Sequence, residues 1–328
     1  MHVLNLLPYG LLDYLDVDAI QRELHRKVAA LEAPDTLIAW EARSVYTAGR
    51  RTEDSDIPDR SVPVIRMDRG GSVTYHGPGQ LVVYPIVKVR PPKDVVAFVR
   101  GTELAIGRAM QAAFGVTTEQ VAGRSGAWIR RPSEIDRKLC AIGIKFAADA
   151  TMHGMALNVN TDLSKFHRVI ACGLADADVA SLEWLGVHTT LPQVAAALLP
   201  ELARTYEQFL LRPSSPQPST LQPSTLQPSM LQPSDKGAAG DSAGEWGVIA
   251  NHEGPNAGGT FPLSKCSTSQ DDAALVAETT STAPAAGAPL TDLPELDAAE
   301  WLSRAPKLRA GQELSRHTGV AWEPKIKG

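Results

Sequence analysis

One of the three cysteines, together with a few lysines and histidines, carries the groups that could do nucleophilic chemistry. Cys172 lies in VIACGLADADVASL, directly before Gly173, at a predicted turn or helix start whose free N–H groups would favour a thiolate. A thiol of pKa about 8.5 is only a few per cent ionised at neutral pH, so a nucleophilic cysteine needs a neighbouring cation or base. The candidates for that neighbour are Lys138, Lys145, His76 and His153.

The other cysteines are expected to be unreactive. Cys140 lies in KLCAIGIKF, an apolar strand pattern in which a free cysteine behaves as a small buried hydrophobe. Cys266 lies in a low-complexity region with nothing nearby to tune its pKa. Three cysteines without CxxC or clustered histidine spacing predict no disulfide framework and no metal site, and they favour a reducing compartment.

The two lysines differ in their expected orientation. Because side chains alternate along a strand, we expect Lys138 and Cys140 on one face and Lys145 on the opposite face, unless a bulge intervenes. By pattern alone either lysine could be a solvated surface charge. Likewise His153, directly before a glycine, could be a hydrogen-bonded loop residue.

The glycine-rich segment RGGSVTYHGPGQL (residues 69–81) is predicted to be a loop between two strands whose backbone approaches a ligand. Arg69 could bind a phosphate or carboxylate, while Tyr75 and His76 could supply a wall and a donor. A purely structural turn would also explain the glycines. The spacing matches neither a Walker nor a Rossmann pattern.

Grouped helices and strands must position these residues. Helical spacing of apolar residues predicts helices over 11–31, 95–115 and 192–211, the last interrupted at Pro200. Strand patterns cover residues 36–42, 62–68, 80–89, 126–130, 138–147 and 154–160. Since the strands do not alternate strictly with helices, we expect an α+β domain with a mixed or antiparallel sheet flanked by helices.

The composition changes after Leu211. Residues 212–234 repeat QPS and are predicted to be a linker, because recurring proline blocks helical hydrogen bonds and little apolar surface is available for burial. Residues 235–328 are expected to be a low-complexity, mostly disordered tail, apart from a short helix over 296–305. The catalytic domain is therefore expected within residues 1–211.

Charge and hydropathy limit the partners and the compartment. The net charge of −5 falls entirely in residues 235–328, and arginines gather in the remainder, where they form either a basic rim suited to an acidic protein partner or dispersed solvated charge. These arginines are Arg50, Arg51, Arg66, Arg69, Arg124, Arg130, Arg131, Arg137 and Arg168. With no signal peptide and no apolar run of about 18 residues, we expect a cytoplasmic protein with neither membrane nor nucleic-acid partners.

Four segments in order resemble the lipoyl(octanoyl) transferase family: residues 69–86, 138–145, 153–166 and 171–182. VYTAGRR (45–51) also fits, and the resemblance covers about residues 3–211. It implies the fold of biotin and lipoate ligases. It also implies transfer of an octanoyl or lipoyl group from octanoyl-acyl carrier protein to a lysine of a lipoyl domain, without a cofactor.

The resemblance also implies roles for residues. Cys172 corresponds to the nucleophile that carries the acyl thioester, and Lys138 to the residue that lowers its pKa. The residue before the cysteine is often proline in the family and is Ala171 here. The implied acyl-binding residues are Arg69, Gly70, Gly71, Ser72, Val73, Thr74, Tyr75, His76, Ala141, Ile142, Gly143, Gly154, Met155 and Ala156.

The implied acceptors are the lipoyl domains of 2-oxoacid dehydrogenase complexes and the glycine cleavage H protein. Two other interpretations stay open. An ATP-dependent lipoate ligase would share the fold, the glycine-rich loop and the lysine, but it would not need Cys172. A non-catalytic module that binds acyl carrier or lipoyl domains would need neither Cys172 nor Lys138.

Overall fold

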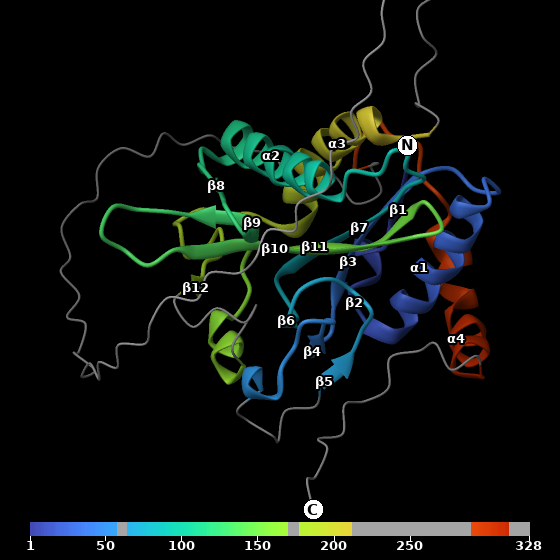
Figure 1. Cartoon of the computed structure of the whole chain (residues 1–328), viewed down its shortest axis with the longest axis horizontal. Helices are drawn as coiled ribbons and strands as arrows, with labels where there is room; N and C mark the ends of the chain where they lie inside the picture. The colour runs from blue at the N-terminus through green and yellow to red at the C-terminus, as the bar shows by residue number, and fades with distance from the viewer. Residues whose placement is uncertain (58–63, 170–176, 212–289, 315–328) are drawn as a thin grey trace, which may run out of the picture. The chain divides into compact units, whose positions relative to one another are not determined.

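The computed structural model describes residues 1–57, 64–169, 177–211 and 290–314 (Figure 1). The chain divides into two compact units, Met1–Pro216 with Ala283–Gly328, and Gln217–Thr282. All described residues belong to the first unit. Within these ranges, no helix is long and apolar enough to cross a membrane.

A mixed sheet of nine strands forms the centre of the described unit. Its main path runs β1-β3-β7-β11-β10-β9-β8, with β2 paired to β3 and β12 paired to β10. The β1–β3, β2–β3 and β10–β12 pairs are parallel, and the others are antiparallel. The strands are β1 His2–Asn5, β2 Leu11–Leu12, β3 Thr36–Ala42, β7 Gln80–Ile86, β8 Glu119–Val121, β9 Arg124–Ile129, β10 Arg137–Ala147, β11 Ala150–Asn158 and β12 Asp178–Val179.

A second sheet of three strands has the order β5-β4-β6. Its strands are β4 Val45–Ala48, β5 Val64–Arg66 and β6 Val73–His76. Tyr46 and Tyr75 pack together in its core with Phe166, which comes from the 3₁₀ helix η3 (Leu163–Arg168). This small core holds the strand of the glycine-rich segment through Val73 and Tyr75.

Helices cover both faces of the main sheet (Figure 1). On one face, α2 (Val95–Phe114) and α3 (Leu191–Tyr206) share a core with Leu81 and Val83 of β7. On the other face, α1 (Tyr14–Ala29) packs on Val82 and Tyr84 of the same strand, as strand alternation requires. The remaining 3₁₀ helices are η1 Leu7–Tyr9, η2 Asp54–Asp56 and η5 Glu207–Phe209.

The predicted α+β class with a mixed sheet is confirmed, and two local expectations were wrong. Helix α3 continues through Pro200, because Leu198, Leu199 and Leu202 around it are fully buried in the helix–sheet core. The glycine-rich segment is not all loop, since residues Val73–His76 form β6.

The C-terminal region contributes one element to this unit. Helix α4 (Ala298–Leu314) covers the short helix predicted over 296–305 except its first two residues, extends beyond it, and packs against α1 (Figure 1). The expectation of a mostly disordered tail did not include this contact. The average composition of the tail did not indicate that Trp301 and Ala305 would pack on α1, which lies near the other end of the chain.

Candidate active site

A cavity of about 580 Å³ lies between the main sheet, α1 and the glycine-rich segment. Cavities of this size typically hold small ligands. The lining residues are Tyr14, Arg51, Glu53, Asp56, Arg69, Gly71, Ser72, Thr74, His76, Tyr84, Gly123, Arg124, Ser125, Lys138, Ala141, Ile142, Gly143, His153, Gly154, Met155 and Ala156. Twelve of the sixteen residues predicted to be catalytic or acyl-binding therefore line one cavity.

Strand β6 divides the predicted acyl-binding residues between two environments. Ser72, Thr74 and His76 line the cavity, while Val73 and Tyr75 point into the core of the small sheet. Gly70 lines a smaller adjoining hollow of about 190 Å³. Alternation along an extended strand accounts for the split, because neighbouring side chains face opposite sides.

A β-bulge in β10 changes the face on which Lys138 lies. The register with β9 shifts between Lys138 and Cys140, so Lys138 lines the cavity together with Ala141 and Gly143. Cys140 is instead fully buried in the core beneath α2 and α3, where burial raises the pKa of its thiol far above the usual range. The expectation that Lys138 and Cys140 share a face was therefore wrong. Cys140 is the structural cysteine that the sequence predicted.

Lys138 is buried at the cavity wall without a carboxylate partner among the described residues. Lys138 is only 7% exposed, and its Nζ lies 4.6 Å from the centre of the Trp128 ring. Lys145, the competing candidate, is bound to Asp68 with an Nζ–Oδ2 distance of 2.5 Å. Lys138 is thus the lysine whose charge is not already neutralised by an acid.

Glu103 of α2 supports the strand beside Lys138. Its Oε1 accepts a hydrogen bond of 2.9 Å from the Gly126 N–H, and its Oε2 pairs with Arg100 at 2.6 Å. Gly126 has φ +134°, and a Cβ there would lie 2.6 Å from the Cys140 carbonyl oxygen and 3.3 Å from Lys138 Cε. Glycine at this position therefore makes room for the lysine side chain.

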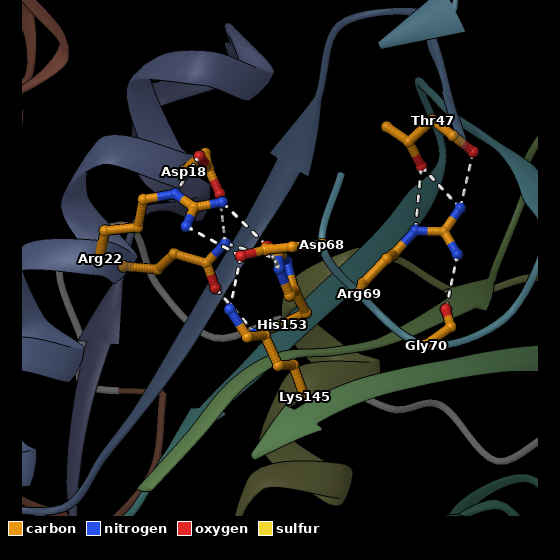
Figure 2. Close-up of polar contacts among 9 residues, drawn as sticks. Asp18, Arg22, Thr47, Asp68, Arg69, Gly70, Lys145 and His153 are labelled. Carbon is orange, nitrogen blue, oxygen red and sulfur yellow. Dashed lines mark hydrogen bonds and ion pairs between the residues drawn. The ribbon is translucent and has the colours of Figure 1, made fainter. Parts of the chain in front are cut away.

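Asp68 is the centre of a charged network next to the glycine-rich segment (Figure 2). Its carboxylate accepts hydrogen bonds from Arg22 of α1, from Lys145 of β10 and from His153 of β11. Burial disfavours the carboxylate, but these three hydrogen bonds outweigh burial and hold the Asp68 pKa well below its usual range. Through Asp68, which directly precedes Arg69, the network connects α1, β10 and β11 to the glycine-rich segment.

His153 is a buried strand residue in this network, not the loop residue that was the alternative. It has φ +57°, which is unusual for a residue other than glycine. Its N–H donates to Gln21 Oε1 at 2.8 Å, and the Gln21 amide nitrogen contacts its Nδ1 at 3.1 Å. Nδ1 therefore accepts, and Nε2–H donates to Asp68 Oδ1 at 2.9 Å. These bonds fix the orientation of the ring between α1 and Asp68.

Arg69 holds the loop in place through bonds to protein groups. Its guanidinium donates to the Thr47 carbonyl at 2.6 Å, to Thr47 Oγ1 and to the Gly70 carbonyl at 2.9 Å (Figure 2). The sequence had suggested a phosphate or carboxylate partner. The structure shows a brace between Thr47 of β4 and Gly70, and the next residue, Gly71, has φ +83°, which favours glycine.

One part of the cavity wall is built from buried aromatic rings. Tyr14 stacks on His76 with ring centres 5.5 Å apart, and Tyr84 meets His153 edge to face at 6.0 Å. Burial and the nearby Arg69 charge lower the pKa of His76 to about 3, although its Nδ1 bonds to Gln80 at 2.8 Å. Burial raises the pKa of Tyr14 to about 12. At neutral pH this part of the wall can accept an apolar group.

The open end of the cavity carries charge. Arg51 and Glu53 are exposed there, and Arg124 is partly exposed. Of the other predicted rim arginines, Arg130, Arg131 and Arg137 each pair with carboxylates. Across the described ranges, no three His, Cys, Asp or Glu side chains are grouped to hold a metal ion.

Cys172, the predicted nucleophile, lies outside the described residues, as does Cys266. The chain that follows Cys172 is nevertheless fixed next to Lys138. Strand β12 pairs in parallel with β10, with Asp178 opposite Arg137 and Val179 opposite Lys138. The Ala180 N–H donates to the Lys138 carbonyl at 3.0 Å.

Sequence reasoning did not assign Tyr14 and Tyr84 to the site. Tyr14 is the first residue of α1, and Tyr84 is one of several apolar residues in β7. Both look like ordinary core positions in the sequence. Only the contact between the helix and the sheet brings them to one cavity.

The family model for the lipoyl protein ligase A/B catalytic domain matches residues 13–203, which contain the whole cavity. The chain belongs to this family. An octanoyltransferase from Acidothermus cellulolyticus is 48% identical over 204 residues, covering 62% of this chain and 90% of the relative. An octanoyltransferase from an Arthrobacter species is 42% identical over 206 residues, covering 62% and 91%. The prediction of an acyltransferase is thereby confirmed.

Solved structures of low sequence identity resemble the chain more loosely. A bipartite lipoate protein ligase with its E2 lipoyl domain from Thermoplasma acidophilum is 16% identical, with a TM-score of 0.48, and covers 62% of this chain and 82% of that chain. A lipoate-protein ligase A bound with ATP is 16% identical, with a TM-score of 0.47, and covers 66% and 90%.

Proposed function

We propose that this enzyme transfers an octanoyl or lipoyl group from acyl carrier protein to a specific lysine of lipoyl domains through an acyl thioester on Cys172. The acceptors would be lipoyl domains of 2-oxoacid dehydrogenase complexes and the glycine cleavage H protein. The observation that carries the proposal is Lys138, buried at the wall of the cavity and paired through its strand with the segment that follows Cys172. Family membership and relatives named octanoyltransferase support it.

Covalent geometry keeps Cys172 within range of the cavity. Four residues separate it from Ala177, the first described residue after it, and the five Cα–Cα steps between them span at most about 18 Å. Ala177 directly precedes Asp178, which lies opposite Arg137. The chain before Cys172 is fixed at Val169, in the core of the small sheet.

In the first step, the Cys172 thiolate attacks the carbonyl carbon of the donor thioester. The tetrahedral intermediate collapses, the carrier's sulfur leaves as a thiol with the proton of the Lys138 ammonium, and the acyl group stays on the Cys172 sulfur. One thioester is exchanged for another, so no ATP is consumed. The Lys138 ammonium stabilises the attacking thiolate by its charge, and among the described residues no carboxylate pairs with it.

In the second step, the ε-amine of the acceptor lysine attacks the acyl-Cys172 carbonyl. A C–N bond forms, the C–S bond breaks, and the Cys172 thiolate leaves. The amine must lose a proton for the amide to form, and Lys138 in its neutral form would be the group to accept it. The acyl chain would lie against the buried aromatic wall of the cavity, while the reacting carbonyl would lie near Lys138.

The test is transfer to a purified lipoyl domain, followed by intact mass. With octanoyl-acyl carrier protein and no ATP, we expect the lipoyl domain to gain one octanoyl group. Cys172→Ala should abolish the gain, whereas Cys266→Ala is the matched control and should keep it. A requirement for ATP, or transfer that survives Cys172→Ala, would contradict the proposal and favour a ligase.

A further inference from the structure

The segment from residue 290 to residue 314, here called the C-terminal clasp, returns to the domain from beyond the QPS repeats. It first extends the main sheet, because β1 is an edge strand with one unpaired side. The Val3 N–H donates to the Pro294 carbonyl and the Leu296 N–H donates to the Val3 carbonyl, both at 2.8 Å. These bonds form a parallel bridge between Val3 and Glu295.

The clasp then places α4 on the outer face of α1. Trp301 and Ala305 are buried there, 7% and 2% exposed, in the hydrophobic cluster that also contains the cavity residue Tyr14. The Trp301 ring has Lys27 of α1 at 5.3 Å and Arg304 at 4.9 Å. A buried tryptophan flanked by cations is the kind of contact that anchors a docked peptide.

Charge complementarity fixes the orientation of α4. Arg309 approaches Asp13 and Asp16 at the start of α1, at 3.3 and 3.2 Å. Arg304 lies 4.0 Å from Glu23 in the second half of α1. The two contacts at separate points along α1 define one antiparallel alignment of the helices.

Helix α4 is poorly suited to exist without α1. It contains Pro306, which removes one hydrogen bond from the helix interior, and Gly311, which is entropically unfavourable in a helix. An isolated helix of this length is marginal even without such residues. Formation of α4 should therefore be coupled to its docking on α1.

The inner face of α1 builds the site. Tyr14 lines the cavity, Gln21 holds the His153 backbone, and Arg22 binds Asp68. We infer that the C-terminal clasp folds onto α1 and β1 and thereby holds the α1 wall of the cavity in place. Through this contact with α1, the C-terminal region would stabilise the position of the cavity wall.

The docking is tested by cutting the full-length chain. A specific protease site is introduced between residues 235 and 260, and the folded protein is cleaved and passed through a size-exclusion column at micromolar concentration. The C-terminal fragment should co-elute with the domain. Trp301→Ala should release it, whereas Lys307→Ala, an exposed substitution on the same helix, should not. Release of the wild-type fragment would overturn the docking.

The effect on α1 is tested by amide hydrogen exchange in the same full-length variants. The His153 amide bonds to Gln21 of α1, so loosening of α1 by Trp301→Ala should speed its exchange by about tenfold or more. The exchange rates of the α2 and α3 amides should be unchanged in both variants. The exchange rate of the His153 amide should be unchanged in Lys307→Ala. If Trp301→Ala released α4 but left the exchange rate of the His153 amide unchanged, the inference that the clasp holds the α1 wall of the cavity would be overturned. Neither test involves octanoyl transfer, so each outcome is independent of the proposed reaction.

Discussion

Asp68 receives a two-point ion pair from Arg22, with Nη2 3.0 Å from Oδ1 and Nη1 3.3 Å from Oδ2. This pair joins α1 to the residue directly before Arg69 and the two glycines of the loop. Because Lys145 and His153 bind the same carboxylate, one side chain determines how a helix, a hairpin and the glycine-rich segment meet.

Asp68→Asn should therefore destabilise the protein and weaken acyl binding together. Removing the charge leaves Arg22 and Lys145 without their common partner, at a cost of about 1–3 kcal/mol in the free energy of unfolding, since the Asp68 side chain is 34% exposed and partly screened. Urea unfolding and the KM for the octanoyl donor measure the two effects. Glu134→Gln, in the exposed pair with Arg131, is the matched control. An equal, small effect of both variants would contradict the role given to Asp68.

Arg69→Lys should loosen the glycine-rich loop. A lysine cannot reproduce the planar fork that reaches Thr47 and the Gly70 carbonyl, so we expect a loss of about 2 kcal/mol in stability and a higher KM for the donor. Arg43→Lys, at an exposed arginine, controls for the substitution itself. If Arg69→Lys bound the donor like the wild type, the brace would be irrelevant to the site.

His76 should make stability depend on pH. Its folded pKa of about 3 lies below the unfolded value of about 6.5, so the unfolded state binds more protons between these values. The contribution of His76 to the free energy of unfolding should therefore be fully present above pH 6.5. It should fall as the pH decreases below that value, by up to about 1.4 kcal/mol per pH unit.

His76→Gln should remove that part of the slope, because glutamine can still bond to Gln80 but does not titrate. Chemical unfolding of both proteins between pH 4.5 and 6.5 measures the difference. Parallel slopes would show that the buried ring is not held neutral.

Gly126→Ala should disturb Lys138 more than it disturbs the fold. The new Cβ would press on the Cys140 carbonyl and on Lys138 Cε, so we expect about 1–3 kcal/mol of destabilisation and a larger fall in the acylation rate. Gly186→Ala, where φ is +83° with no atom within 4 Å, separates backbone strain from the clash. Similar losses of activity in both variants would argue against a positioning effect on Lys138.

The regular elements were predictable because each follows from local spacing. The strand over 36–42 coincides with β3, and the helix over 95–115 nearly coincides with α2. The split within β6 was also available in principle, because alternation alone sends Val73 and Tyr75 away from Thr74 and His76. The expectation treated those residues as one loop, and therefore as one binding surface.

Other features depended on contacts that no local pattern contains. The bulge after Lys138 arises from the register between β9 and β10, so it could not be inferred from the alternation of β10 by itself. Asp68 and His153 look unrelated in the sequence until the sheet brings them within 2.9 Å. The clasp likewise depends on an α1 surface that is far from α4 along the chain.

The central claim, an acyl group carried on Cys172 and promoted by Lys138, is tested most directly by intact mass of the enzyme after brief incubation with octanoyl-acyl carrier protein and no acceptor. We predict one octanoyl adduct, which hydroxylamine removes and proteolytic mapping places on Cys172. Its formation should be slowed by at least about 100-fold in Lys138→Met. An adduct on another residue, or one formed equally fast without Lys138, would contradict the account.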